Sequence, residues 1–224
     1  MSARTSTISP AMEDYLKAIH QIAEDTGGGP VQTQALSDRL QVSTASVTGM
    51  MTKLDQFKLV EHEPYRGVVW TPRGEQVALE VLRHHRLLEL YLVEQLGMSW
   101  EEVHAEADRL EHVISEDLED RIAAALGQPE RDPHGDPIPA RDGTVPSDPW
   151  QRLTAVTAGT AVEILRVSDR DPRLLQYLAE RGLRPGATVS VESVDELAGV
   201  ITLSVDGTTS TLALTTVTEI SVRV

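Results

Sequence analysis

Histidine and carboxylate residues recur at helical spacing in the stretch from Trp100 to about Leu126. Asp108, Glu111 and His112 are three and four residues apart, so on a helix their side chains meet on one face. His104 lies one helical turn before Asp108. Two carboxylates and an imidazole at one helical level repel or compete unless a cation lies between them, and a divalent metal ion is the natural occupant. The alternative is a charged helix face in solvent.

A second pair lies upstream and strengthens the metal hypothesis. His85 and Glu89 are four residues apart, which places them one turn apart on a helix. His85, Glu89 and His104 could together hold a second ion. The alternatives are a salt-bridged His85–Glu89 pair and a half-buried His104.

Two helices are predicted to position these groups. Thr71 and Pro72 form a cap and first-turn pair for a long helix that ends near Leu96. An apolar stripe at spacings of three and four residues predicts a second, single helix over about 100–126. Its members are Val103, Ala107, Leu110, Ile114 and Leu118. This stripe exceeds what one helix could bury alone, so we expect a homodimer packed through these helices.

The N-terminal part predicts a winged helix-turn-helix. A helix begins at Ser9–Pro10, a short helix covers 34–40, a helix capped by Ser43 runs to Phe57, and two strands cover 59–63 and 68–71. In such a fold the helix at 43–57 enters the major groove of double-stranded DNA. The predicted base contacts are Ser43, Thr44, Ala45, Ser46 and Thr48, and the predicted phosphate contacts are Lys53, Tyr65 and Arg66. The alternative is a winged helix used only for protein contacts.

The net charge of −15 looks unfavourable for a nucleic-acid binder, but its distribution weakens the objection. Residues 76–150 hold 17 acidic against 6 basic residues, or −11, whereas residues 1–75 hold 9 against 7, or −2. The excess therefore lies where cations are expected to bind.

Cysteine is absent, which excludes disulfides and thiolate metal sites. The sequence shows no apolar run long enough for a membrane span and no signal-peptide pattern, so we expect a cytoplasmic protein.

The fold class expected is mainly α with a small β domain. We predict a DNA-binding domain over 1–74, a helical dimerisation and metal-binding domain over 75–126, a proline-rich linker over 127–152 and a β domain over 153–224. The linker includes His134, which we expect to be a loop residue and not a ligand. Alternating apolar and polar residues after 153, with a hairpin at Asp206–Gly207, indicate a small β-barrel.

Four segments carry a resemblance to a known family: Met12–Ile19, Arg83–Glu89, Val103–His112 and Pro133–Pro139. In these segments and in their order, the chain resembles the metal-dependent repressors of the diphtheria-toxin-repressor and manganese-transport-regulator family. The resemblance implies that the C-terminal domain is SH3-like.

The resemblance also implies ligand sets for the two sites. It makes Asp14 a ligand, although alone this residue reads as a solvated charge favoured at a helix start. The primary site would then be Asp14, Asp108, Glu111 and His112. The second site would be His85, Glu89 and His104, completed from the β domain, with Asp169 and Asp171 as the candidates.

Ligand chemistry favours manganese. Three carboxylates and one imidazole suit Mn²⁺, whereas iron-type members of the family carry Met and Cys in place of Asp14 and Asp108. Fe²⁺ is the alternative, and Co²⁺, Zn²⁺ or Cd²⁺ could substitute in vitro.

The chain departs from the family at two points. Lys17 replaces a carboxylate that manganese-type members often have, which argues against a bridged two-manganese cluster, and Gly49 replaces a base-contacting Gln.

The sequence therefore predicts a Mn²⁺-activated transcriptional repressor that binds a palindromic DNA operator as a homodimer and controls metal-uptake genes. One alternative is an Fe²⁺-dependent repressor of the same family. Another is a metal-independent winged-helix regulator that senses an organic ligand, although we expect no small organic ligand and no membrane contact. A metallohydrolase is disfavoured because no nucleophile or oxyanion-stabilising motif accompanies the ligands, so we do not expect an enzyme.

Overall fold

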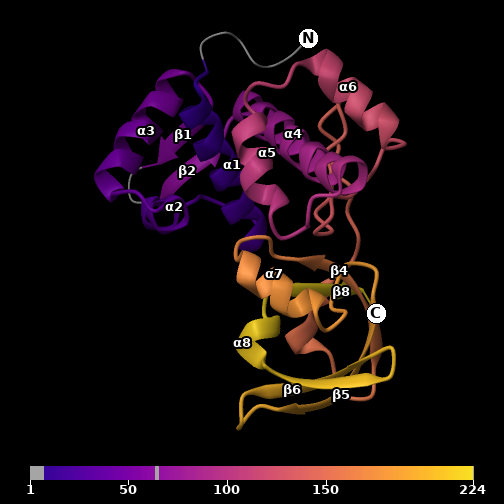
Figure 1. The fold of residues 1–224 in the computed structure, drawn as a ribbon. Coiled ribbons are helices and arrows are strands. Elements are labelled where there is room, and N and C mark those ends of the chain that lie inside the picture. Colours follow the sequence, from indigo (N-terminus) through magenta and orange to yellow (C-terminus); the bar gives the residue numbers. More distant parts are fainter. Residues whose placement is uncertain (1–7, 64–65, 224) are drawn as a thin grey trace. The chain divides into compact units, whose positions relative to one another are not determined.

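The computed structural model describes residues 8–63 and 66–223 (Figure 1). The chain forms two compact units, and each is assembled from separate stretches of sequence. The first unit takes the described residues up to His85, together with Leu110–Glu119 and Pro139–Thr144. The second takes Arg86–Arg109, Asp120–Ile138 and the C-terminal stretch from Val145.

The first unit contains the predicted winged helix-turn-helix. Its elements are α1 (Pro10–Asp25), α2 (Thr33–Leu40), α3 (Thr44–Gln56), β1 (Val60–Glu63) and β2 (Gly67–Trp70). The two strands pair antiparallel, from Val60 opposite Trp70 to Glu63 opposite Gly67. One apolar core joins the helices to this hairpin, and it includes Met12, Leu16, Ile19, Leu36, Val47, Leu54 and Val68. The predicted order of helices and hairpin is confirmed.

The helix starts follow the predicted capping chemistry. The Ser43 hydroxyl accepts a hydrogen bond from the Ser46 amide at 3.1 Å and so caps α3. The Thr71 hydroxyl accepts one from the Gly74 amide, also at 3.1 Å, at the start of α4 (Pro72–Leu96). A Cβ on Gly74 would lie 1.7 Å from the Leu59 carbonyl oxygen, so only glycine allows α4 to begin against the wing.

The prediction of a single helix over about 100–126 is wrong. The structure has α5 (Val103–Leu110) and α6 (Glu116–Ala125), separated by a turn. Ser115 starts the second helix, because its hydroxyl accepts from the Leu118 amide at 3.3 Å and its carbonyl from the Glu119 amide at 2.9 Å. A serine followed by acidic residues favours a new helix start over continuation. The apolar spacing alone did not show this break.

The second unit contains the C-terminal β domain. Its strands are β3 (Gln151–Arg152), β4 (Ala161–Val167), β5 (Thr188–Asp195), β6 (Val200–Val205), β7 (Thr208–Ala213) and β8 (Ile220–Arg223). They form an antiparallel sheet in the order β3-β8-β4-β5-β6-β7. The six-stranded sheet confirms the predicted small SH3-like domain. The described strands leave this sheet open, so the predicted barrel is not confirmed. Asp206 and Gly207 have φ of 48° and 79°, which is the left-handed pair that the predicted β6–β7 hairpin requires.

The first part of the proline-rich segment, up to Ile138, belongs to the second unit. Asp132 and His134 are buried, and one Asp132 carboxylate oxygen accepts from the amides of His134 and Asp136 at 2.8 and 2.9 Å. A Cβ on Gly135 would lie 1.8 Å from the Leu165 carbonyl oxygen of β4. His134 is a loop residue, as predicted, but it is fully buried. Across the described ranges, no helix combines the length and apolar character that crossing a lipid bilayer would need.

Candidate metal centre

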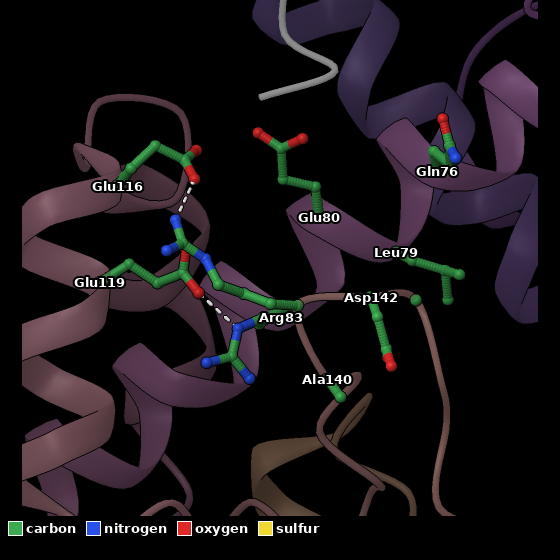
Figure 2. Close-up of a pocket in the computed structure, with 10 residues that line it drawn as sticks. Gln76, Leu79, Glu80, Arg83, Glu116, Glu119, Ala140 and Asp142 are labelled. Carbon is green, nitrogen blue, oxygen red and sulfur yellow. Dashed lines mark hydrogen bonds and ion pairs between the residues drawn. The ribbon is translucent and has the colours of Figure 1, made fainter. Parts of the chain in front are cut away.

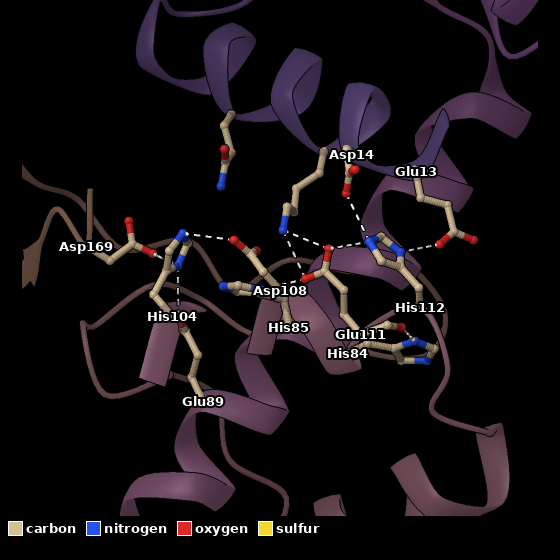
Figure 3. Close-up of polar contacts among 12 residues, drawn as sticks. Glu13, Asp14, His84, His85, Glu89, His104, Asp108, Glu111, His112 and Asp169 are labelled. Carbon is tan, nitrogen blue, oxygen red and sulfur yellow. Dashed lines mark hydrogen bonds and ion pairs between the residues drawn. The ribbon is translucent and has the colours of Figure 1, made fainter. Parts of the chain in front are cut away.

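One group of metal-ligating atoms lies in the first unit, where α1 meets the turn after α5. Asp14, Glu111 and His112 each offer a ligand atom, and these atoms lie within 4.8 Å of one another (Figure 3). The Nε2 atom of His112 is 3.0 Å from an Asp14 carboxylate oxygen and 3.6 Å from the Glu111 Oε1 atom. Three of the four residues predicted for the primary site therefore converge.

A carboxylate that the sequence did not single out orients His112. The buried Glu13 carboxylate accepts a hydrogen bond from His112 Nδ1 at 2.6 Å, which leaves Nε2 directed at Asp14. Such a partner for the second ring nitrogen is usual for a metal-bound histidine. The hydrogen bonds to Asp14 and Glu13 raise the pKa of His112 to about 9 despite partial burial. The same negative surroundings that hold a proton here would favour a divalent cation.

The spacing of the donor atoms fits one metal ion. Two ligands about 2.1 Å from an ion lie about 3.0 Å apart at a right angle and about 3.4 Å apart at a tetrahedral angle. The two distances from His112 Nε2, 3.0 Å to Asp14 and 3.6 Å to Glu111, are close to these values. Carboxylate oxygen and imidazole nitrogen are donors that suit Mn²⁺ and Fe²⁺ alike.

Glu111 also contacts two basic side chains of the same unit. The Lys17 ammonium donates to both of its carboxylate oxygens, at 2.7 and 2.9 Å. His85 Nδ1 lies 2.5 Å from Oε2. Glu111 is fully buried, so these contacts compensate a charge that water cannot reach. His85, predicted for the second site, is thus hydrogen-bonded to a carboxylate predicted for the primary site.

A second group lies in the second unit. His104 Nδ1 is 2.9 Å from an Asp169 oxygen and 3.1 Å from the Glu89 Oε1 atom. Burial alone would lower the pKa of His104, but Asp169 and Glu89 outweigh it and raise the pKa to about 11. Asp108 is also here, 3.6 Å from His104 Nε2. The other candidate from the β domain, Asp171, instead caps α7 (Pro172–Ala179) through the Arg173 amide.

His134 and Asp132 extend this second group beyond the sequence prediction. Together with Glu89 they form a fully buried set of potential ligands. His134 Nε2 donates to the Trp100 carbonyl oxygen at 2.7 Å, which turns Nδ1 toward Glu89 at 3.5 Å. Burial lowers the pKa of His134, but Glu89 and Asp132 raise it to about 10. Proline and glycine around His134 hid it, because that composition suggests an exposed loop.

A buried ion-pair network lies on α4 beside a polar pocket of about 520 Å³ (Figure 2). Glu119 accepts hydrogen bonds from Arg83 Nε and from His84 Nε2, the latter at 3.0 Å. All three side chains are buried, and Arg83 also donates to the Pro139 carbonyl oxygen at 2.8 Å. Glu116 lies closer to solvent and pairs with Arg141 at 2.6 Å. The network joins α4 to α6 within the first unit.

The predicted DNA-contacting residues lie mostly exposed on and before α3. Ser43, Thr44, Ala45, Ser46, Thr48 and Lys53 are all exposed. The Thr48 hydroxyl donates to the Thr44 carbonyl oxygen at 2.9 Å. Arg66 is exposed in the wing and pairs with Glu63 at 3.3 Å, whereas Tyr65 lies outside the described residues.

Comparison with known proteins identifies the family. Three family models match in order: the N-terminal DNA-binding domain of iron-dependent repressors at 7–68, their metal-binding and dimerisation domain at 71–140, and the FeoA domain at 151–224. The iron-dependent repressor IdeR of Mycobacterium leprae is 34% identical over 194 residues, which cover 81% of this chain and 83% of that protein. The chain belongs to the DtxR/IdeR family of metal-dependent repressors.

Further proteins are similar to this chain in sequence and in structure. The diphtheria toxin repressor of Corynebacterium diphtheriae is 31% identical over 205 residues, covering 87% of this chain and 88% of that protein. A manganese-dependent transcriptional repressor in complex with manganese has a TM-score of 0.87 and 39% identity, covering 95% of this chain and 99% of that one. ScaR with bound Zn²⁺ has a TM-score of 0.80 and 32% identity, covering 95% and 98%.

The family match fixes the general function. The protein is a metal-dependent, DNA-binding transcriptional repressor with a dimerisation domain, as the sequence predicted. Transcriptional repressors of this family are not a class of enzymes. Several sequence relatives are named for iron and several structural relatives for manganese, so the family match leaves the metal to be argued from the site.

Proposed function

We propose that the protein is a Mn²⁺-activated repressor of metal-uptake genes. The observation that carries this proposal is the donor set of Asp14, Glu111 and His112, which converges without any sulfur ligand. Sites rich in carboxylate oxygen suit Mn²⁺ better than they suit the softer metal ions that prefer sulfur ligands. We propose Asp108, three residues before Glu111, as the fourth ligand. Fe²⁺ is the second candidate, because several relatives, including IdeR of Mycobacterium leprae, are named iron-dependent repressors.

The domain plan that accompanies this function has four parts. We propose a DNA-binding domain over 1–74, a dimerisation and metal-binding domain over 75–126, a linker over 127–152 and an SH3-like domain over 153–224. A homodimer presents two copies of α3 related by two-fold symmetry, so its operator is palindromic. A regulator that binds genomic DNA works in the cytoplasm, where we place this protein.

The switch follows from where the ligands lie in the sequence. Asp14 is on α1 of the DNA-binding domain, whereas Glu111 and His112 follow α5 in the dimerisation domain. A divalent cation held by the three side chains would neutralise their negative charge and tie the two domains together. Fixing that link sets the spacing of the two α3 helices for half-sites about 34–36 Å apart. Metal acts only through its higher affinity for this linked state.

The second group has a separate role in the proposal. Glu89, His104 and Asp169 connect the long helix and α5 with the segment after β4, and we propose that a second cation there stabilises the C-terminal domain. His85 and Asp171 remain the other predicted ligands of this site. We expect His104→Ala to lower the metal stoichiometry but to keep part of the DNA binding. An unchanged stoichiometry in calorimetry would refute this assignment.

The decisive experiment measures fluorescence anisotropy of a palindromic operator from the protein's own promoter region. The protein is titrated with chelator, with Mn²⁺ or with anaerobic Fe²⁺. We expect binding with Mn²⁺ alone, and an equal response to both metals would refute the choice of manganese. Binding in chelator that no metal changes would refute the metal switch.

A variant of Asp14 separates its role as a metal ligand from its role in joining the DNA-binding domain to the dimerisation domain. Asp14→Ala should weaken metal-activated DNA binding far more than metal binding, because Asp14 supplies one of several ligands but is the only proposed ligand on α1. Glu163→Ala, on β4, is the control because it removes an exposed carboxylate from the C-terminal domain. Equal losses of metal binding and of DNA binding in Asp14→Ala would contradict the mechanism.

A further inference from the structure

Lys17 is a cation built into the primary metal site. It lies on α1, three residues after Asp14, with its side chain 11% exposed. Its ammonium contacts both carboxylate oxygens of the fully buried Glu111, at 2.7 and 2.9 Å. Lysine is among the residues least often buried, and it is usually buried only with a partner. The partner here is a proposed metal ligand.

Both carboxylate oxygens of Glu111 have basic side chains as contact partners. Oε2 is bonded to Lys17 at 2.9 Å and lies 2.5 Å from His85 Nδ1. Oε1 is bonded to Lys17 at 2.7 Å and lies 3.6 Å from His112 Nε2. A metal ion that used His112 and Glu111 together would therefore take Oε1, the oxygen with the shorter contact to Lys17.

We propose that Lys17 acts as an internal competitor and tether: it joins α1 to Glu111 when no metal is bound, and it yields Glu111 Oε1 when the cation binds. This inference rests on the proposed function of Asp14, Glu111 and His112 as a metal site. It changes the account of the metal-free state, because the ammonium already neutralises one of the carboxylates. It also sets the metal concentration at which the repressor responds.

The direction of the effect follows from three contributions of the same sign. Removing the ammonium abolishes competition for Oε1, removes a positive charge beside the incoming cation, and leaves Glu111 buried without its cation in the metal-free protein. Each contribution favours the metal-bound form over the metal-free form. Lys17→Met should therefore bind Mn²⁺ about tenfold more tightly or better, and the metal-free protein should melt at a lower temperature.

The experiment is a Mn²⁺ titration by calorimetry, with thermal melts in chelator and in saturating Mn²⁺. All proteins carry His104→Ala, so that the second site is weakened equally throughout. The Lys17 variants are Lys17→Met, Lys17→Gln, which keeps a hydrogen-bond donor if the Met variant does not fold, and Lys17→Arg, which keeps the charge. Lys58→Met is the matched control, because it removes an exposed lysine from the same unit. Asp14→Asn reports whether the titrated site is the proposed one.

The expected result is tighter Mn²⁺ binding and a larger metal-induced rise in melting temperature for the Met and Gln variants. The Arg variant and Lys58→Met should stay within about twofold of the parent. Unchanged or weaker binding in both uncharged variants, while Asp14→Asn still weakens Mn²⁺ binding, overturns the role of Lys17 alone. Binding that Asp14→Asn leaves intact overturns the proposed site and the competition with it.

Discussion

The stability of the first unit should depend strongly on Glu119, a residue with no proposed contact to metal or DNA. Glu119 is 1% exposed and accepts hydrogen bonds from Arg83 and His84. Glu119→Gln keeps the shape but removes the negative charge. Arg83 cannot lose its proton, so its guanidinium would stay buried without its counter-charge.

The magnitude follows from the cost of breaking one side of a buried ion pair. Such changes cost about 3–5 kcal/mol, and Gln keeps an oxygen acceptor for Arg83, so we expect a loss at the low end, about 3 kcal/mol at pH 7. For a chain of this length that corresponds to a fall of about 6–12 °C in melting temperature. Glu116→Gln is the control on the same helix. Glu116 is 40% exposed and pairs with a half-exposed Arg141, so its loss should cost less than about 1 kcal/mol.

The dependence on pH gives a second test of the same charge. Burial raises the pKa of Glu119, but the hydrogen bonds and charges of His84 and Arg83 outweigh it and lower the pKa below its ordinary 4.5. A carboxylate with a lowered folded-state pKa contributes stability above pH 4.5 and loses it as pH falls toward that lowered value. The difference between wild type and Glu119→Gln should therefore be constant from pH 7 to about 5.5 and shrink below 4.5.

The assay is urea denaturation followed by circular dichroism at pH 7, 5.5 and 4. A loss in Glu119→Gln no larger than that in Glu116→Gln would refute the buried-pair argument. A difference that grows on acidification would show that the sign of the pKa shift is wrong.

Three further substitutions test local features of the fold. Gly49→Ala should stabilise α3 by about 1 kcal/mol, because a Cβ there meets no atom within 4 Å and glycine is a poor helix former; no gain in the urea midpoint would contradict this. Gly74→Ala should cost about 3 kcal/mol or more, since its Cβ would overlap the Leu59 carbonyl oxygen, and a near-native melting temperature would show that the wing gives way. Ser43→Ala should cost about 1 kcal/mol through loss of the α3 cap, measured in chelator without DNA; a loss under about 0.3 kcal/mol would contradict a stabilising cap.

Local signals in the sequence predicted most elements of the fold. Thr71–Pro72 marked the start of α4, and Asp206–Gly207 marked a hairpin, because caps and turns depend on residues close in sequence. The two-residue strand at Gln151–Arg152 was missed, because so short a segment shows no alternation. It is a strand only through its pairing with β8, which is about 70 residues away in sequence.

Three of the four residues predicted for the primary site converge, but their hydrogen-bond partners were not predicted. Helical spacing drew attention to Glu111 and His112, although the helix ends just before them. Glu13 and Lys17 were not assigned to the site, because their partners are 99 and 94 residues away in sequence. The available signal was that Glu13 and Lys17 lie beside the buried face of α1. A charged side chain needs a compensating partner when it is buried, but the sequence does not show which residue that partner is.

The division of the chain into interleaved stretches has a consequence for its synthesis. The first unit needs Leu110–Glu119 and Pro139–Thr144, so the ribosome must release residue 144 before that unit can be completed. At about 5–20 residues per second, the interval between residue 85 and residue 144 lasts roughly 3–12 seconds. During that time the nascent DNA-binding domain lacks Glu111, His112 and Glu119 until each has emerged. A newly made repressor therefore cannot respond to metal through this site until at least half of its chain has been translated.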